Sequence, residues 1–308
     1  MKGSFSKNDY FTKLSIILVL LFGVSCSSYK TPSRKVIPID TLPSSIQVSL
    51  NDDGRIFINA QLKDDSVSLM LDTYAGYSIF PEQWVGNYGL EKTPIKHITR
   101  DYLNKRSKSR LHTVDSLVVG NSFYVNNLLI KPSKILDPFN VGILGLNILN
   151  EYNWKFRFAD KELDLDKEEF PISSDYIVSK FTRGVFPYFI LNSDGIEQKM
   201  IVDLGAGKSL YIPAKSELGQ ALIQKYQPSR ELVTSGGANS NGVTDYQYNF
   251  TIPEIELEGQ MFKDVDITLS ESSKLYFIGT SFLSKGELIY NPLTSDSRVS
   301  MVAFKLLE

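Results

Sequence analysis

Two stretches of this chain share one design. The first reads Leu-Met-Leu-Asp-Thr-Tyr-Ala-Gly-Tyr-Ser-Ile-Phe over residues 69–80, and the second reads Lys-Met-Ile-Val-Asp-Leu-Gly-Ala-Gly-Lys-Ser-Leu-Tyr over residues 199–211. In each, an apolar segment typical of a buried strand runs into an aspartate, turns on small residues and passes through a serine into a second apolar segment. A carboxylate placed directly after buried residues is costly unless it is paired or hydrogen-bonded. The repetition therefore predicts that Asp72 and Asp203 are brought together, although either one alone could simply cap a turn.

The surroundings of the two aspartates repeat as well. Residues 141–149 read Val-Gly-Ile-Leu-Gly-Leu-Asn-Ile-Leu, and residues 276–283 echo them as Tyr-Phe-Ile-Gly-Thr-Ser-Phe-Leu. The aspartates are 131 residues apart (203 − 72), and the central glycines of the echo are 134 apart (279 − 145). A repeat this long indicates two similar lobes rather than a solenoid. The glycines suggest strands that pass close to another backbone.

Alternating apolar and polar residues joined by tight turns predict β-strands throughout both halves. The 18 Phe and 16 Tyr favour strands too. The predicted strands cover residues 46–50, 56–62, 67–71, 109–119, 123–130, 188–191, 199–202, 248–252 and 255–257, with a short helix over 146–152 and closing hairpins over 154–165 and from 286. We therefore predict a mostly all-β fold of two similar lobes with short helices, lobe 1 over residues 45–170 and lobe 2 over residues 171–308.

Composition and charge argue against several classes of protein. The net charge is −2, so no strong field for nucleic acid is expected. The single cysteine excludes an intrachain disulfide and a cysteine-based zinc site, and the two histidines, His97 and His112, lack metal-ligand spacing. Residues 205–209, Gly-Ala-Gly-Lys-Ser, imitate the end of a phosphate-binding loop, but Val202 stands where that loop needs a glycine. We expect no metal, no cofactor, and no nucleotide or nucleic-acid partner.

Residues 1–25 have the pattern of a signal peptide. Three lysines precede an apolar run over residues 14–22, too short for a comfortable membrane span, and small residues then lead to Cys26. This arrangement resembles a bacterial lipoprotein signal, which implies lipidation of Cys26; an ordinary signal with a coincidental cysteine stays open. Residues 26–44, with several Pro, Ser and Thr, are expected to form a tether. The resemblance implies a lipid-anchored protein of the bacterial cell envelope, on its periplasmic or extracellular face.

The repeated motif also resembles that of a known enzyme family. The pattern apolar-apolar-Asp-(Thr/Ser)-Gly-Ala, followed about seventy residues later by Ile-Leu-Gly-Leu-x-x-Leu (residues 143–149), is similar to the retropepsin-like and pepsin-like aspartic peptidases. The resemblance runs through both halves and implies a fused form of two pseudo-symmetric, β-barrel-like lobes. Each lobe would give one aspartate, so Asp72 and Asp203 would be the catalytic pair. The residues that would support the pair in its turns are Thr73, Ala75, Gly205 and Ala206.

This likeness implies hydrolysis of peptide bonds in a peptide or unfolded protein substrate. Two carboxylates about 3 Å apart cannot both ionise easily, so they share one proton and titrate together. The ionised member would activate a water, and the protonated member would donate to the peptide carbonyl. Ala75 and Ala206 offer no hydroxyl donors to the carboxylates, so we expect a working pH nearer mildly acidic or neutral than strongly acid.

Each half departs from the family pattern once. Tyr74 stands where the family has a glycine that lets the backbone turn tightly. Leu204 stands where the family has a hydroxyl residue that exchanges hydrogen bonds beneath the dyad, so Thr73 can offer its half of that exchange and Leu204 cannot. Two alternatives therefore stay open: a catalytically silent relative that binds peptide or a partner protein between the lobes, and a structural surface lipoprotein without a ligand.

The resemblance also implies a flexible hairpin, or flap, over the substrate in each lobe. In lobe 2 the glycine-rich segment around Gly236 and Gly237 is the predicted tip. Subtracting the 131-residue offset places the tip of lobe 1 at residues 105–110, which begin with Lys105 and Arg106. Its basic residues could attract acidic substrates, but a solvated hairpin end explains them as well.

Overall fold

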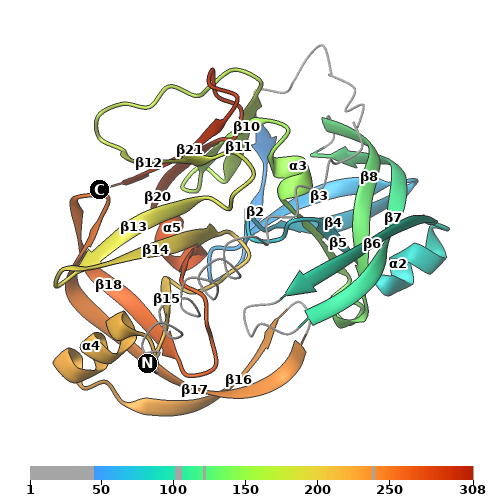
Figure 1. Cartoon of the computed structure of the whole chain (residues 1–308). Helices are drawn as coiled ribbons and strands as arrows, with labels where there is room; N and C mark the ends of the chain where they lie inside the picture. Colours follow the sequence, from blue (N-terminus) through green and yellow to red (C-terminus); the bar gives the residue numbers. More distant parts are fainter. Residues whose placement is uncertain (1–44, 101–105, 121–122, 238–239, 308) are drawn as a thin grey trace, which may run out of the picture. The chain divides into compact units, whose positions relative to one another are not determined.

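The computed structural model describes residues 45–100, 106–120, 123–237 and 240–307 (Figure 1). The predicted signal peptide and tether, and with them Cys26, lie outside the described residues. Lys105 and the two residues that follow Gly237 lie outside them too.

Lobe 1 is a closed β-barrel of six strands. The strands occur in the order β3-β4-β9-β5-β8-β7, and β3 also pairs with β7, which closes the ring. Along β3 the residues are alternately buried and more exposed, so the apolar side chains fill the barrel. Two further strands, β2 and β6, extend the sheet at its ends. The strands are β2 (Ser49–Leu50), β3 (Ile56–Leu62), β4 (Asp65–Leu71), β5 (Ser78–Pro81), β6 (Glu91–Arg100), β7 (Arg106–Val119), β8 (Phe123–Ser133) and β9 (Val141–Leu144).

Lobe 2 repeats this barrel. Its strands occur in the order β13-β14-β19-β15-β18-β17, with β13 pairing β17 to close the ring and β16 extending the sheet beyond β17. The strands are β13 (Tyr188–Ser193), β14 (Ile196–Asp203), β15 (Leu210–Pro213), β16 (Arg230–Gly237), β17 (Ser240–Leu257), β18 (Gln260–Ser270) and β19 (Phe277–Gly279). Because the two rings share one strand order, β4 corresponds to β14 and β9 to β19. The predicted all-β fold of two pseudo-symmetric barrel-like lobes is confirmed.

A third sheet of six strands is built from both halves. Its order is β1-β11-β10-β20-β21-β12, and the central pairing joins β10 to β20, with Trp154 opposite Tyr290. The two closing hairpins predicted from the sequence are the centre of this sheet. Its strands are β1 (Ile46–Gln47), β10 (Asn153–Arg157), β11 (Glu162–Asp166), β12 (Ile177–Thr182), β20 (Gly286–Asn291) and β21 (Val299–Leu306). The halves are therefore connected by backbone hydrogen bonds as well as by the chain.

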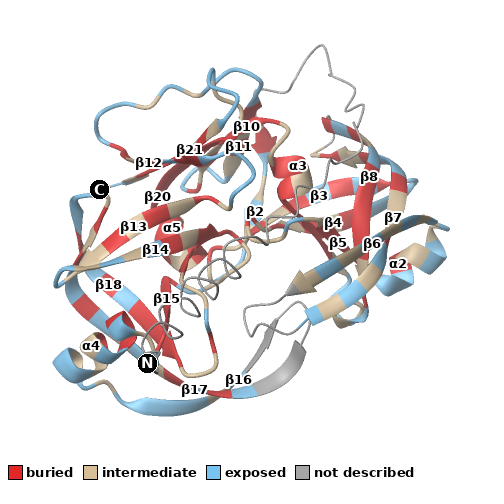
Figure 2. Cartoon of the chain, in the orientation of Figure 1, coloured by how far each residue is buried: buried red, intermediate tan, exposed pale blue. Residues whose placement is uncertain are grey.

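Helices are few and short in the described residues. The predicted helix over 146–152 is shorter than expected and ends at residue 149, and lobe 2 has its counterpart in α5. Three of the helices were not predicted: α2, η1 and α4. The helices are α2 (Glu82–Asn87), η1 (Lys134–Leu136), α3 (Leu146–Leu149), α4 (Glu217–Tyr226) and α5 (Thr280–Leu283). In Figure 2, the outer faces of α2 and α4 are exposed, whereas buried residues run along the strands.

Strand β17 corrects one element of the sequence analysis. The sequence analysis predicts residues 248–252 and 255–257 as separate strands, and Pro253, which carries no N–H for a ladder, lies between them. The structure has one continuous strand, whose pairing with β18 passes over Pro253 and Asp264 and resumes at Glu254. Asp264 adopts a positive φ of 51° at this irregularity. The proline is tolerated because the strand is locally unpaired there.

Candidate active site

The two aspartates lie at matching ends of matching strands. Asp203 is the last residue of β14 and pairs with Gly279 of the parallel strand β19. Asp72 follows β4 directly, and its N–H donates to the Leu144 carbonyl oxygen of the parallel strand β9 at 3.0 Å. In both lobes, the strand that leads to the aspartate (β4 or β14) is therefore hydrogen-bonded to the strand at whose end the repeated glycine lies (β9 or β19).

The repeated glycines let the backbone after each aspartate pass close by. The N–H of Leu146 donates to the Ala75 carbonyl oxygen at 2.7 Å, and the N–H of Thr280 donates to that of Ala206 at 2.8 Å. A Cβ on Gly145 would lie 2.4 Å from the Ala75 oxygen, and one on Gly279 would lie 2.4 Å from the Ala206 oxygen. Any side chain would clash with backbone, so the predicted close approach is confirmed in both lobes.

The two carboxyl groups meet between the turns. Their side chains are hydrogen-bonded to each other. A Cβ placed on Gly205 would lie 2.7 Å from Cγ of Asp72 and 3.2 Å from Oδ1 of Asp203, so both carboxyl groups also contact this one glycine. Asp203 is only 7% exposed and Asp72 is half-buried. The structure thus brings together the two residues that the sequence repeat paired.

Backbone donors fix each carboxyl group in its turn. Oδ1 of Asp72 accepts from the N–H groups of Tyr74 at 2.8 Å and Ala75 at 2.9 Å. Oδ1 of Asp203 accepts from the N–H of Gly205 at 2.9 Å, and the Asp203 carbonyl oxygen accepts from the N–H of Ala206 at 3.2 Å. The turns themselves therefore supply the donors, as suits alanine side chains without hydroxyl groups.

Burial shifts the titration of the pair. It raises the pKa of Asp203 well above its ordinary value, and the charge of Asp72 raises it further. Burial raises the pKa of Asp72 as well, against the lowering effect of its two backbone donors and of the hydrogen bond from Asp203. Two carboxyls this close therefore titrate as one coupled pair, and burial favours a state in which they share one proton.

Thr73 links the lobes directly beneath the pair. Its hydroxyl donates to the Val202 carbonyl oxygen at 2.5 Å and accepts from the Leu204 N–H at 3.1 Å, and the Thr73 side chain is buried. Leu204 is also fully buried, but its side chain is apolar and joins the core. The exchange of hydroxyl hydrogen bonds that the family resemblance implies is therefore half present, as the sequence indicated.

Tyr74 occupies its position without a left-handed backbone. Its φ is not among the positive values of the chain, so the tight turn does not force a glycine there. Its ring lies 4.7 Å from the ring of Phe186 and 5.3 Å from that of Phe277, measured between centroids. Both partners belong to lobe 2. Sequence reasoning missed these contacts, because nothing in the local pattern connects Tyr74 with Phe186.

The predicted flaps lie at the ends of two hairpins. In lobe 2, Gly236 and Gly237 are the last residues of β16, and Gly237 pairs with Ser240 across a tip outside the described residues. In lobe 1, Arg106 pairs with Arg100 at the start of β7. The predicted loop over 105–110 is wrong in its extent: residues 106–110 form a strand paired with β6, since polar and basic residues alternate well enough to build an exposed hairpin arm.

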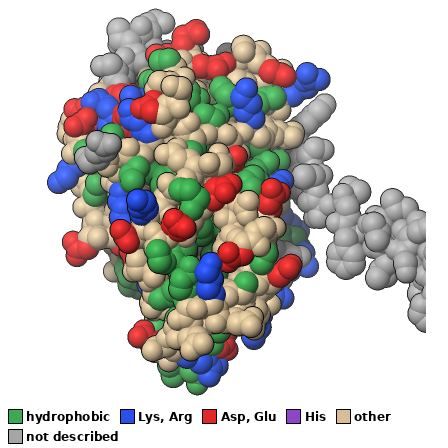
Figure 3. Space-filling model, turned by 90° about the vertical axis from the view of Figure 1, so that its left-hand side faces the viewer, with side chains coloured by type: hydrophobic (Ala, Val, Ile, Leu, Met, Phe, Trp, Pro, Cys, Tyr) green, Lys and Arg blue, Asp and Glu red, His purple; other side chains and the backbone are tan. Residues whose placement is uncertain are grey.

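The two histidines belong to no candidate metal site in the part of the chain that the structure describes. No group of three or more His, Cys, Asp or Glu side chains suited to a metal ion occurs among those residues. The His97 ring packs on Tyr77 with centroids 4.5 Å apart, and burial lowers its pKa. Positive and negative side chains are scattered among apolar and polar ones over the face in Figure 3.

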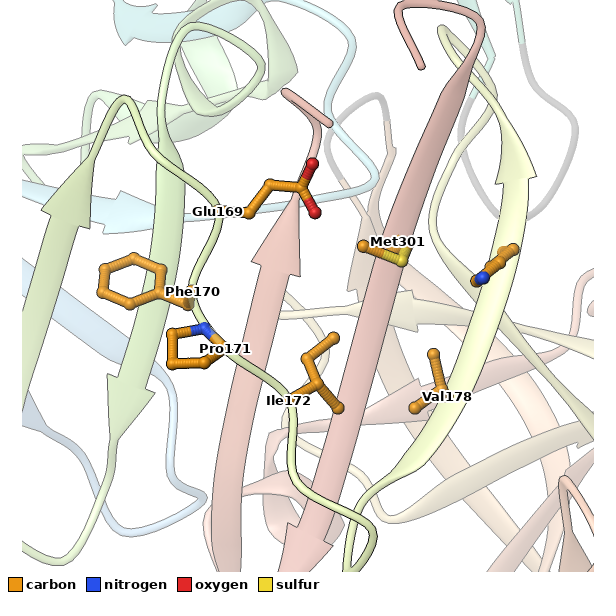
Figure 4. Close-up of a pocket in the computed structure, with 7 residues that line it drawn as sticks. Glu169, Phe170, Pro171, Ile172, Val178 and Met301 are labelled. Carbon is orange, nitrogen blue, oxygen red and sulfur yellow. The ribbon is translucent and has the colours of Figure 1, made fainter. Parts of the chain in front are cut away.

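A shallow hollow beside the third sheet is unrelated to the aspartates. It lies where the link between β11 and β12 crosses the sheet, and Figure 4 shows Ile172, Val178 and Met301 at its floor and sides. Phe170, Ile172 and Val178 pack there on a small core of their own around Tyr176. The hollow is a packing feature of the seam between the lobes.

No helix among the described residues has the length and apolar character needed to cross a membrane. A comparison with protein-family models and with curated proteins finds no match for this chain. Function is therefore inferred from the site itself.

Proposed function

We propose that this protein is an aspartic endopeptidase that hydrolyses peptide bonds of an extended peptide held between the lobes. The observation that supports this most directly is the pair of hydrogen-bonded carboxyl groups of Asp72 and Asp203, presented by matching turns of two matching barrels. A singly protonated pair of buried carboxyls is suited to acid and base catalysis at once.

The two carboxyls would act on one water. The ionised member of the pair takes a proton from the water while the water oxygen bonds to the peptide carbonyl carbon, and the protonated member donates its proton to the carbonyl oxygen. As the tetrahedral intermediate collapses, one of its hydroxyl groups returns a proton to the carboxylate that lost one, and the other carboxyl gives its proton to the leaving nitrogen. The C–N bond breaks, and an acid and an amine are released. The pair returns to its singly protonated state without a covalent enzyme intermediate.

The direct test is cleavage of an unstructured protein by the full chain, extracted with detergent. We expect peptide products at mildly acidic to neutral pH, and inhibition by a peptide that mimics the tetrahedral intermediate. Asp72→Asn and Asp203→Asn should each lower the rate by roughly 10²–10⁴-fold. Both variants should stay folded, because asparagine keeps the shape of the side chain. Equal turnover by wild type and Asp72→Asn would refute the proposal.

One observation favours a second candidate function, the binding of peptide or a partner protein without catalysis. Leu204 removes one of the two hydroxyl groups beneath the pair, and Thr73 alone connects the lobes there by a side-chain hydroxyl. Catalytic geometry must hold to about 0.5 Å, so a looser site favours a silent relative that binds peptide or a partner protein. Saturable binding of the mimic without cleavage of any peptide would support this alternative.

We also propose that a lipid on Cys26 anchors the protein in the cell envelope. The support is the sequence pattern of lysines, apolar residues and small residues before that cysteine. Metabolic labelling with a fatty acid should mark the wild type and leave Cys26→Ser unlabelled. Labelling that is absent from both, or equal in both, would count against the anchor.

A further inference from the structure

The two turns differ at one position beside the carboxyl pair. The N–H of Tyr74 donates to Asp72 at 2.8 Å, and the N–H of Gly205 donates to Asp203 at 2.9 Å, so the two residues hold the same place in their turns. A Cβ on Gly205 would lie 2.7 Å from the carboxyl carbon of Asp72, in the opposite lobe. From the correspondence of the two turns we infer that the side chain of Tyr74 leaves its turn on the Asp203 side.

On the Asp203 side, the space is filled by an aromatic cluster. The Tyr74 ring lies between Phe186, 4.7 Å away, and Phe277, 5.3 Å away. Phe277 is 4% exposed and its ring is 6.1 Å from that of Tyr211, so the cluster continues into the wall of lobe 2. Tyr74 itself is half-buried. Lobe 1 thus inserts a ring into an aromatic recess of lobe 2, which we call the Phe186–Phe277 recess.

On the Asp72 side, the matching place is without a side chain. Gly205 offers only hydrogen there. The residue that corresponds to Phe277 by the 134-residue offset of the glycines is Ile143, a buried aliphatic residue (277 − 134). Phe186 corresponds by the 131-residue offset to Arg55, whose guanidinium is turned to Asp53 at 2.6 Å (186 − 131). The two sides of the dyad are therefore sterically unequal.

We propose that Tyr74 is a specificity-determining residue: by filling the Phe186–Phe277 recess, it restricts one residue flanking the scissile bond to a small side chain. This inference rests on the proposed peptidase function. Successive side chains of an extended peptide point to opposite faces, so the two residues that flank the cleaved bond meet different walls. The substrate class is a peptide with Gly, Ala or Ser on one side of the cleaved bond.

The test uses the full chain and synthetic peptides of one length with two randomised central positions, read by mass spectrometry. Wild type should discriminate against a large side chain at one flanking position by about 10- to 200-fold in kcat/KM. Tyr74→Gly should abolish that discrimination, and Tyr74→Phe should keep it. Phe186→Ala enlarges the same recess without touching the turn and should shift the preference in the same direction.

A matched control separates a size effect from a general loss of aromatic packing. Phe250 is half-buried in lobe 2 and its ring packs on Tyr226 at 5.7 Å, so Phe250→Ala removes a comparable contact from β17. This variant should keep the wild-type preference. A preference that is the same in wild type, Tyr74→Gly and Phe186→Ala overturns the role of Tyr74 while cleavage itself upholds the peptidase.

Binding of tetrahedral-intermediate mimics supplies a second readout. In a series of mimics that differ only in the size of the side chain at the restricted position, affinity for wild type should increase as that side chain becomes smaller. In Tyr74→Gly, affinity should no longer depend on its size. Size-dependent binding without any cleavage refutes hydrolysis and upholds the steric role. Neither binding nor cleavage by wild type, Tyr74→Phe or Tyr74→Gly, each folded by its thermal transition, overturns both proposals.

Discussion

At the scale of single residues, Thr73 contributes the clearest stabilising contact between the lobes. Its buried hydroxyl serves a carbonyl oxygen and an N–H of lobe 2 at once. Thr73→Val keeps the shape but leaves both backbone groups without this partner, and each such group costs about 1–3 kcal/mol. We expect the free energy of unfolding to fall by about 2–4 kcal/mol in a urea titration. Thr73→Ser should retain most of the stability. A Thr73→Val protein as stable as wild type would show that the contact does not stabilise the fold.

Asp203 should make stability depend on pH in an unusual direction for an acid. Its pKa in the folded state lies well above the ordinary 3.8, so the folded protein keeps a proton that the unfolded chain releases. Below pH 3.8 both states hold the proton and nothing is lost; as pH rises from there toward the raised pKa, this residue increasingly favours the unfolded state. Asp203→Asn removes the effect.

The variant therefore gains stability relative to wild type as pH rises. Denaturant titrations of both proteins at pH 3 to 7 measure the difference in unfolding free energy. A difference that stays constant over this interval, or that moves in favour of wild type, would contradict the raised pKa. Asp194→Asn, at an exposed aspartate in the turn between β13 and β14 that forms an ion pair with Lys225, provides the comparison for a generic loss of one carboxylate.

The residue scale also shows where sequence reasoning reached its limit. The pairing of Asp72 with Asp203 followed from the repeat, because an aspartate after buried strands needs a partner and two equal motifs can supply it. The hydroxyl hydrogen bonds between the turns were predicted to come from Thr73 only, because Leu204 has no hydroxyl group. The contact of Tyr74 with Phe186 could not follow, since the residues are 112 positions apart (186 − 74) and Phe186 lies in an irregular segment without a motif.

At the scale of elements, the repeated glycine at the end of β9 and of β19 positions the turn that follows each aspartate. Gly145→Ala would place a Cβ 2.4 Å from the Ala75 oxygen and 2.8 Å from the Tyr77 backbone, so the turn after Asp72 must shift. We expect at least about 1–3 kcal/mol of destabilisation together with loss of peptide cleavage or binding. Gly76, in the same turn, has no atom within 4 Å of its would-be Cβ, and Gly76→Ala should be nearly neutral.

Thermal unfolding and the peptide assay measure both variants side by side. Equal behaviour of Gly145→Ala and Gly76→Ala would mean that the close approach is unimportant for the site.

Elements with a clear local pattern were predicted well, and those that depend on distant partners were not. Strands β3, β4, β7 and β8 were located within a few residues, whereas β6, β12 and β18 were not predicted and β17 begins eight residues before its predicted start (248 − 240). Helix α4 was missed although its signals are present: Ser216 accepts from the N–H of Gly219 at 3.0 Å, and Leu218 and Leu222 share its buried face. The third sheet could not be read from the pattern, because its central strands are joined only by pairing across the two halves.

At the scale of the whole molecule, two buried asparagines fasten the seam between the lobes. Nδ2 of Asn153 donates to the carbonyl oxygens of Lys167, Glu168 and Leu293 at 2.8–3.2 Å, and its Oδ1 accepts from the Leu293 N–H at 3.0 Å. Asn291, on the neighbouring strand, makes two such bonds with Phe170. The link that leaves lobe 1 is therefore held to strands of both halves.

Because the third sheet and the core run through both halves, we expect the lobes to unfold together. Trp84 lies in lobe 1 and Trp154 in the third sheet, so fluorescence follows these regions, whereas far-ultraviolet circular dichroism follows strands of the whole chain. The two urea transitions should coincide in wild type.

Asn153→Ala should lower the free energy of unfolding by about 2–4 kcal/mol and so move both transitions to lower urea concentrations, since several buried backbone groups lose their partner. Asn87→Ala, at an exposed position at the end of α2, should leave them unchanged. Transitions that separate in wild type, or an Asn153→Ala protein as stable as Asn87→Ala, would mean that the lobes are independent domains. The pair of aspartates would then depend on the contacts of Thr73 and Tyr74 with lobe 2 and on the hydrogen bond from the Thr280 hydroxyl to the Asp53 carbonyl oxygen.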